Sequence, residues 1–209
     1  MNQDDKNHFQ DAYSLEDADQ TLKHYKNWAE SYDEEIGEQN GYAQPARTAE
    51  ALLKHGLAGD ARILDAGCGS GLSGVALHDA GYSTIDGCDF SPEMLEKAAD
   101  KGVYGRLWNA DLNVGQPDIP DSSYDAVVAV GIYSFGHLEP DSCDDLIRIV
   151  RPRGLFVIAL NEPYWDSSTL PQKLSALESD GKIEMLSKEY GDHLPGHNVM
   201  GWVITMRKT

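Results

Sequence analysis

A short run of alternating glycines, preceded by an acidic residue, is the first feature of the sequence that could do chemistry. Residues 63–71 read ILDAGCGSG, so a buried strand leads to Asp65 and then to a glycine turn. Glycine lets the backbone approach a ligand without a β-carbon in the way. A helix that begins just after the turn leaves N–H groups without partners, and a carboxylate before it can hold an ammonium group. The run predicts a ligand-binding turn.

Two more acidic residues close predicted strands further along the chain. Asp89 ends the next strand, where a carboxylate can accept hydrogen bonds from both hydroxyls of a ribose. Phe90 and Met94 follow as apolar surfaces that could sandwich a purine. Asp111 ends the third strand and could accept from an adenine amino group while Leu112 packs on the ring. Together these residues indicate a nucleoside site.

The elements that must position these residues alternate between strand and helix. This alternation favours a mostly parallel sheet with helices on both faces. Two final strands joined by a Gly/Pro loop suggest an antiparallel edge. We therefore expect an α/β, Rossmann-like three-layer sandwich around a seven-stranded, mostly parallel sheet with an antiparallel last strand. The predicted strands are 61–66, 83–88, 103–109, 124–130, 155–160, 182–189 and 199–207, and the predicted helices are 15–32, 45–55, 72–80, 91–99 and 141–150.

The N-terminal part of the chain differs from the rest. Tyr25, Trp28 and Tyr32 recur at helical spacing and form an aromatic stripe. Such a stripe suits a lid over a ligand site, and it equally suits a helix packed in the core. We expect residues 1–58 to form a helical lid or extension, and residues 59–209 to form the Rossmann-like domain, in one compact unit.

Composition narrows the possible partners. With 17 Lys+Arg against 35 Asp+Glu, the formal charge is −18, and such a chain repels phosphate backbones and anionic lipids. We therefore expect no nucleic-acid and no membrane partner. No apolar run approaches the roughly 18 residues that span a bilayer, and the polar N-terminus does not resemble a signal peptide. The three cysteines lack metal-ligand spacing, which predicts no metal and a reducing, cytoplasmic setting.

The three acidic motifs, in this order, resemble the S-adenosylmethionine site of class I methyltransferases. The resemblance implies S-adenosylmethionine as cofactor and S-adenosylhomocysteine as product. It assigns the glycine turn to the methionine moiety, the acid after the second strand to the ribose, and the end of the fourth strand to the sulfonium. The implied cofactor residues are Asp65, Ala66, Gly67, Cys68, Gly69, Gly71, Asp89, Phe90, Met94, Asp111, Leu112, Val130 and Gly131, with Tyr25 and Tyr32 from the lid.

A closer resemblance covers roughly residues 25–160. It is to the methyltransferase-like proteins of the Williams–Beuren syndrome region and their bacterial relatives. It implies cofactor binding without indicating a particular substrate. The residues that carry it are Tyr42 and Pro45, Tyr104, Gly131, and the run Gly136-His137-Leu138.

Two rival functions fit part of the sequence. Residues 69–74 satisfy the dinucleotide pattern G-x-G-x-x-G, so a nicotinamide-dependent oxidoreductase is one rival. Asp65 stands where those enzymes usually have an apolar residue, and no tyrosine has a lysine four residues later. The other rival is a non-catalytic S-adenosylmethionine-binding protein, because a fold alone does not establish catalysis.

His137 and Tyr133 are the candidate catalytic residues. Both follow the fourth predicted strand, close to the expected methyl group, and a histidine there could act as a general base. The alternative for His137 is a packed or solvent-bridging side chain. His193 and His197 fall in a predicted loop and are expected at the surface. We expect methyl transfer to O, N or S of a small molecule, in a pocket completed by residues 161–181, by a monomer or homodimer.

Overall fold

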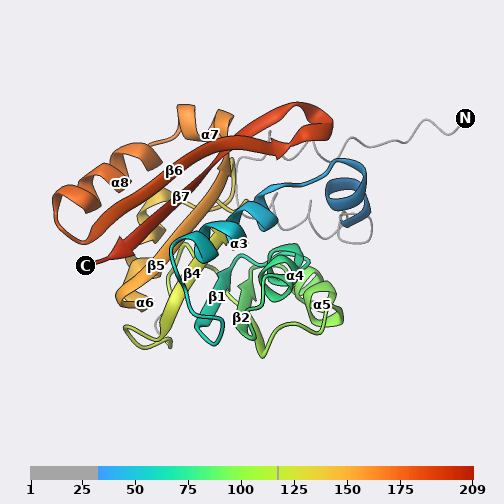
Figure 1. Cartoon of the computed structure of the whole chain (residues 1–209), viewed down its shortest axis with the longest axis horizontal. Helices are drawn as coiled ribbons and strands as arrows, with labels where there is room; N and C mark the ends of the chain where they lie inside the picture. The colour runs from blue at the N-terminus through green and yellow to red at the C-terminus, as the bar shows by residue number, and fades with distance from the viewer. Residues whose placement is uncertain (1–32, 117) are drawn as a thin grey trace, which may run out of the picture.

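The computed structural model of the chain describes residues 33–116 and 118–209. Within them, seven strands form one sheet in the order β3-β2-β1-β4-β5-β7-β6 (Figure 1). The predicted helix 15–32, with Tyr25 and Tyr32, lies outside the described residues. Its role as a lid therefore stays a prediction.

The described elements follow the predicted alternation closely. The strands are β1 (Arg62–Ala66), β2 (Thr84–Asp89), β3 (Arg106–Asn109), β4 (Tyr124–Val130), β5 (Val150–Asn161), β6 (Ile183–Leu194) and β7 (Val199–Lys208). The α-helices are α3 (Gln44–Lys54), α4 (Leu72–Asp79), α5 (Pro92–Asp100), α6 (Cys143–Ile149), α7 (Glu162–Ser167) and α8 (Leu170–Ser179). A π-helix, η1 (Asp33–Gln39), and two 3-10 turns, η2 (Pro140–Ser142) and η3 (Pro195–His197), complete them.

The strands pair in the predicted directions, parallel first and antiparallel at the C-terminal edge. Strands β1 to β5 pair in parallel, whereas β7 runs antiparallel to both β5 and β6. The chain fills the sheet in one direction from β1 to β3 and then returns to start β4 on the other side of β1. In parallel sheets a ligand crevice opens at such a reversal, beyond the carboxyl ends of the strands. The glycine turn after β1 lies at this point.

Helices cover both faces of the sheet and make the three layers (Figure 1). On one face, Leu52 of α3 and Leu77 of α4 pack in the core with Ile63 of β1. On the other face, α6, α7 and α8 cover a core that includes Leu64 of β1. Neighbouring residues of β1 thus face opposite layers, as the two-residue period of a strand requires.

Residues 161–181, which we expected to complete the pocket, form α7 and α8 instead. The side chain of Asn161 caps α7 by accepting a hydrogen bond of 2.8 Å from the N–H of Tyr164. Leu170 and Leu174 of α8 are buried in the core. No residue of 161–181 lines the pocket described below, so the expectation about this segment is wrong.

Candidate active site

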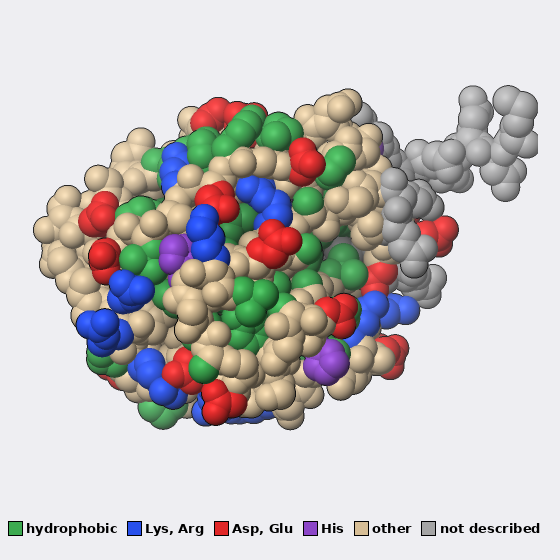
Figure 2. All heavy atoms as spheres, in the orientation of Figure 1, with side chains coloured by type: hydrophobic (Ala, Val, Ile, Leu, Met, Phe, Trp, Pro, Cys, Tyr) green, Lys and Arg blue, Asp and Glu red, His purple; other side chains and the backbone are tan. Residues whose placement is uncertain are grey.

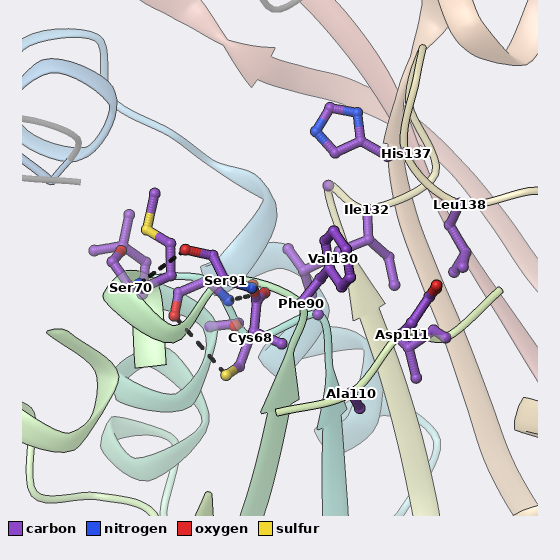
Figure 3. Close-up of a pocket in the computed structure, with 18 of the residues that line it drawn as sticks. Cys68, Ser70, Phe90, Ser91, Ala110, Asp111, Val130, Ile132, His137 and Leu138 are labelled. Carbon is purple, nitrogen blue, oxygen red and sulfur yellow. Dashed lines mark hydrogen bonds between the residues drawn. The ribbon is translucent and has the colours of Figure 1, made fainter. Parts of the chain in front are cut away.

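A pocket opens beyond the carboxyl ends of β1, β2, β3 and β4 (Figure 3). Its cavity volume is about 150 Å³. Most of the residues singled out in the sequence line it. They include Gly67, Cys68, Gly69, Asp89, Phe90, Met94, Asp111, Leu112, Val130, Gly131 and His137.

The glycine turn gives the pocket a floor of bare backbone. Gly67 and Gly69 both have positive φ, at 70° and 54°, a conformation that favours glycine. The N–H groups of Gly67 and Cys68 donate to the carbonyl of Cys88, at 2.8 and 2.9 Å, which ties the turn to β2. A β-carbon on Gly67 would overlap the side chain of Ile132, whereas one on Gly69 would enter open space. The backbone at Gly69 is therefore accessible to a ligand.

Asp89 is held in place by backbone donors on two sides. Its carboxylate accepts hydrogen bonds from the N–H of Gly69 at 2.8 Å and from the N–H of Ser91 at 2.9 Å. Burial raises the pKa of Asp89, against the lowering effect of these N–H groups. Each carboxylate oxygen has two acceptor positions, and Asp89 lines the pocket. The carboxylate can therefore still accept from hydroxyl groups of a ligand.

Asp65 lies behind the pocket wall rather than in it. It is fully buried, and its Oδ2 accepts from the hydroxyls of Ser73 at 2.6 Å and Tyr104 at 2.7 Å. Burial raises the pKa of Asp65 to about 6. Its Oδ1 has no hydrogen-bond partner among the described residues. Ser73 lines the pocket, so Asp65 is connected to the pocket wall by one hydrogen bond.

Three other predicted residues also lie outside the pocket wall. Ala66 is fully buried in the sheet. Gly71 immediately precedes α4 with a φ of 95°, and a β-carbon on it would point toward the end of α5. Tyr133, which we expected near the methyl group, points into the core instead. It is fully buried, and its hydroxyl lies 3.0 Å from both Ser142 Oγ and Cys143 Sγ. Tyr133 is therefore not part of the catalytic proposal below.

The loops after β3 and β4 are joined across the pocket by Asn113, which the sequence analysis did not single out. Asn113 Nδ2 donates to the carbonyl of His137 at 3.0 Å, and its Oδ1 accepts from the N–H of Glu139 at 2.9 Å. Its own N–H donates to Asp111 at 2.9 Å. An Asp two residues before an Asn marks a turn, but no local signal indicates the bridge to the second loop.

His137 stands at one end of the pocket, on the side of Ile132 and away from Ser70 (Figure 3). Its Nδ1 lies 2.6 Å from the carbonyl oxygen of Phe135. A carbonyl can only accept, so Nδ1 carries the proton and the neutral ring has its lone pair on Nε2. This is the tautomer that can take a proton through Nε2.

A strap, residues 40–47, brings Tyr42 and Pro45 to the pocket wall. It is held by the β6–β7 hairpin: the N–H of Ala43 donates to the carbonyl of His193, and the N–H of Gly196 donates to that of Asn40, both at 3.0 Å. The strap therefore reaches the site from the antiparallel edge of the sheet.

Buried polar side chains reinforce this attachment. Gln44 Nε2 donates to the carbonyl of Leu160 at 3.1 Å and lies 3.0 Å from His193 Nδ1. Arg47 donates to the carbonyls of Asp192 at 2.8 Å and Glu189 at 2.9 Å. His193 is only 7% exposed, so the expectation that it lies at the surface is wrong. Burial, together with the nearby Arg47, lowers its pKa to about 4.

Asp33, in η1, lies next to the glycine turn. Its carboxylate accepts from the hydroxyl of Ser70 and forms a salt bridge with Lys101 at the end of α5. Ser70 lines the pocket. Asp33 is thus linked to the pocket wall through Ser70.

Comparison with known proteins identifies the class. Residues 63–154 match a family model described as "Methyltransferase domain". Human methyltransferase-like protein 27 is 34% identical over 171 residues, which cover 80% of this chain and 67% of that protein. A crystal structure of a TehB-like methyltransferase from Corynebacterium glutamicum superposes with a TM-score of 0.65 at 22% identity, over 90% of this chain and 99% of that one.

The fold and site are those of an S-adenosylmethionine-dependent methyltransferase, with S-adenosylmethionine as its cofactor. More specifically, the chain belongs to the family of methyltransferase-like protein 27. The resemblance seen in the motifs is thereby confirmed. The residues present also fit the cofactor, because the pocket combines an accessible glycine backbone, a fixed carboxylate and apolar walls.

The expectation of a small-molecule acceptor without nucleic acid is corrected by a second relative. A probable 18S rRNA (guanine-N(7))-methyltransferase of Dictyostelium discoideum is 40% identical over 83 residues, 40% of this chain and 25% of that protein. A related domain therefore belongs to a protein named for action on RNA. The net charge did not exclude an RNA substrate. Net charge describes the whole surface, whereas recognition of an acceptor depends on local groups.

No helix within residues 33–116 and 118–209 has both the length and the apolar character that crossing a bilayer requires.

Proposed function

We propose that the pocket binds S-adenosylmethionine with its adenosine between Asp89 and Leu112 and its methionine end over the glycine turn. The observation that carries this proposal is the convergence of the first three strand ends on one hollow, with Asp89 and Gly69 hydrogen-bonded to each other in its wall. Phe90 and Met94 offer apolar surface for the adenine ring. Asp89 offers acceptors for the ribose hydroxyls.

The bound cofactor supplies a methyl group on a positively charged sulfur, which is already a strong electrophile. The residues of the chain therefore have to position an acceptor in line and exclude water. Positioning of this kind contributes roughly 7–11 kcal/mol to the lowering of a barrier. In our proposal the acceptor enters between the strap and residues 136–138, where Tyr42 and His137 flank the end of β4.

His137 is the proposed proton acceptor. Support comes from its place in the pocket wall and from the Nδ1–Phe135 contact, which leaves the lone pair of the neutral ring on Nε2. A hydroxyl or a protonated amine must lose a proton for methyl transfer, and Nε2 could take it. A thiolate or neutral amine would need no base during the transfer itself.

Two measurements test the proposal. Calorimetry should give micromolar binding of S-adenosylmethionine and S-adenosylhomocysteine; the absence of heat with both would overturn it. Incubation of the protein and methyl-tritiated cofactor with a cell extract, followed by separation into RNA, protein and low-molecular-mass fractions, should then place the label in one fraction. Asp89→Ala is the matched negative control, because it removes the proposed ribose contact.

A further inference from the structure

Two indole rings hold a lysine ammonium at the antiparallel edge of the sheet, and a tyrosine ring packs against one of the indoles. Lys188 Nζ lies 3.9 Å from the ring centroid of Trp165 and 4.0 Å from that of Trp202. The two indole centroids are 6.2 Å apart with planes inclined at 48°, and the ring of Tyr190 lies 4.7 Å from Trp202. We call Trp165, Tyr190 and Trp202 the aromatic cage. None of them lines the pocket.

The fold explains how the aromatic cage forms from distant parts of the chain. Tyr190 of β6 is directly paired with Trp202 of β7, so both side chains project from the same face of the sheet. Lys188 is two residues before Tyr190 and therefore projects from that face as well. Helix α7 covers this face and brings Trp165 against Trp202.

The aromatic cage has an acidic rim. The hydroxyl of Tyr190 donates to Glu162 at 2.8 Å, and Asp166 raises the pKa of Lys188 by its charge, although burial has the larger effect and lowers it. Figure 2 shows hydrophobic side chains gathered over α7 and the adjoining part of β6, with acidic side chains beside them. A surface of this kind attracts cations with apolar substituents.

Lys188 itself demonstrates the preference for a cation. It makes no salt bridge or hydrogen bond with any other described residue, although the chain has 35 Asp+Glu. Its ammonium group is held by the faces of the two indoles. An ammonium group is strongly hydrated, and contact with rings removes part of that water. An alkylated ammonium group is less hydrated and offers methyl groups to the rings.

We propose that the aromatic cage is a binding site for a methylated ammonium group, with Lys188 as the internal cation that such a ligand would displace. Recognition of quaternary ammonium by converging aromatic faces is an established use of cation–π attraction. Lys188 is exposed and lies on the edge strand, so its side chain can leave without disturbing the core. The site is separate from the methyl-transfer pocket, and the proposal does not depend on it.

The indole N–H resonances of Trp165 and Trp202, followed by NMR during titration with tetramethylammonium chloride, test the proposal. The Lys188→Met variant should bind tetramethylammonium about tenfold more tightly than the unaltered chain does, because the competing cation is gone. Adding Trp165→Leu to Lys188→Met should abolish the response. Ammonium chloride at the same concentrations is the control for ionic strength, and Lys182→Met is the control for loss of an exposed lysine away from the rings.

Three results would overturn the proposal. They are no response of Lys188→Met while the resonance of Trp108 shows an intact fold, an equal response to ammonium chloride, or an equal gain from Lys182→Met. Free trimethyl-lysine and a peptide that contains it then distinguish the source of the ligand. Tighter binding of the peptide identifies a methylated protein side chain, and equal binding identifies a small quaternary amine.

Discussion

The hydroxyl of Tyr42 lies only 2.4 Å from the position that a β-carbon on Gly131 would take at the end of β4. A glycine at 131 therefore lets the strap close over the pocket. We expect Gly131→Ala to push Tyr42 outward and to weaken S-adenosylhomocysteine binding at least about tenfold, or about 1.4 kcal/mol, as measured by calorimetry.

Gly102 is a control that separates the effect of steric overlap with Tyr42 from the effect of a positive φ. Gly102 has a φ of 67°, close to the 76° of Gly131, but a β-carbon there would meet nothing within 4 Å. Gly102→Ala should reduce the free energy of unfolding by about 1 kcal/mol and leave cofactor affinity unchanged. Equal losses of affinity in both variants would contradict the role assigned to Tyr42.

Removal of the Asp89 carboxylate should affect binding and stability together. Charge-assisted hydrogen bonds contribute about 1.5–3 kcal/mol, so Asp89→Ala should lose at least about tenfold in S-adenosylhomocysteine affinity. The melting temperature without ligand should also fall, because the N–H groups of Gly69 and Ser91 lose their acceptor. Asp79→Ala removes an exposed carboxylate on α4 and should change neither. Unchanged affinity of Asp89→Ala would refute the ribose assignment.

The proposed role of His137 predicts a loss of rate without a loss of binding. With the acceptor fraction identified by tritium transfer, His137→Gln should lower the turnover rate by about 10²–10⁴, the usual contribution of a general base. Affinity for S-adenosylhomocysteine should stay the same in calorimetry. A parallel fall in affinity would instead make His137 a residue that only shapes the pocket.

The buried His193 should make stability depend on pH in the mildly acidic range. Its pKa falls from 6.5 to about 4 on folding, so between these values the unfolded chain binds a proton that the folded chain does not. Stability is therefore lost as the pH falls from about 6.5 to about 4, by up to about 3 kcal/mol at 1.36 kcal/mol per pKa unit.

Urea unfolding at pH 7 and at pH 4.5, for the unaltered chain and for His193→Gln, measures this contribution. Glutamine does not titrate, so the variant should lose less stability between the two pH values. The difference between the two losses isolates His193 from the many carboxylates of the chain. Identical losses would show that His193 is not buried as a neutral ring.

Replacement of Arg153 by glycine should stabilise the folded protein. Arg153 has a φ of 66° in the exposed first part of β5, a conformation that costs a non-glycine residue roughly 1–2 kcal/mol. Arg153→Gly should therefore raise the free energy of unfolding, by up to about 1 kcal/mol once the greater flexibility of glycine is counted. Asn198→Gly, at a φ of 54°, should gain less, because asparagine tolerates this region.

Helix and turn boundaries could be predicted from the sequence because the residues that set them lie within a few positions of the boundary. The glycine turn at 67–71 and the cap and proline at Ser91-Pro92 each fix a boundary within a few residues. The same cap-and-proline signal occurs at Asn161 with Pro163 at the start of α7. This signal predicts a helix that begins at Glu162, although residues 161–181 were not among the predicted helices.

The rest depends on contacts between residues far apart in the chain. Gln44 and His193 are separated by 149 positions, and neither has neighbours that indicate the other. Without that contact, a histidine beside a Gly/Pro turn reads as an exposed loop residue. Tyr133 was misplaced for a similar reason, because its partners Ser142 in η2 and Cys143 in α6 determine that its ring turns into the core.

The docking of the strap on the β6–β7 hairpin has a consequence for the order in which the protein is made. Synthesis proceeds from the N-terminus, and the strap precedes every strand of the sheet. Its partners, the carbonyls of Glu189, Asp192 and His193, are synthesised about 145 residues later than the strap. The outer wall of the pocket therefore cannot close on a nascent chain until the hairpin has left the ribosome.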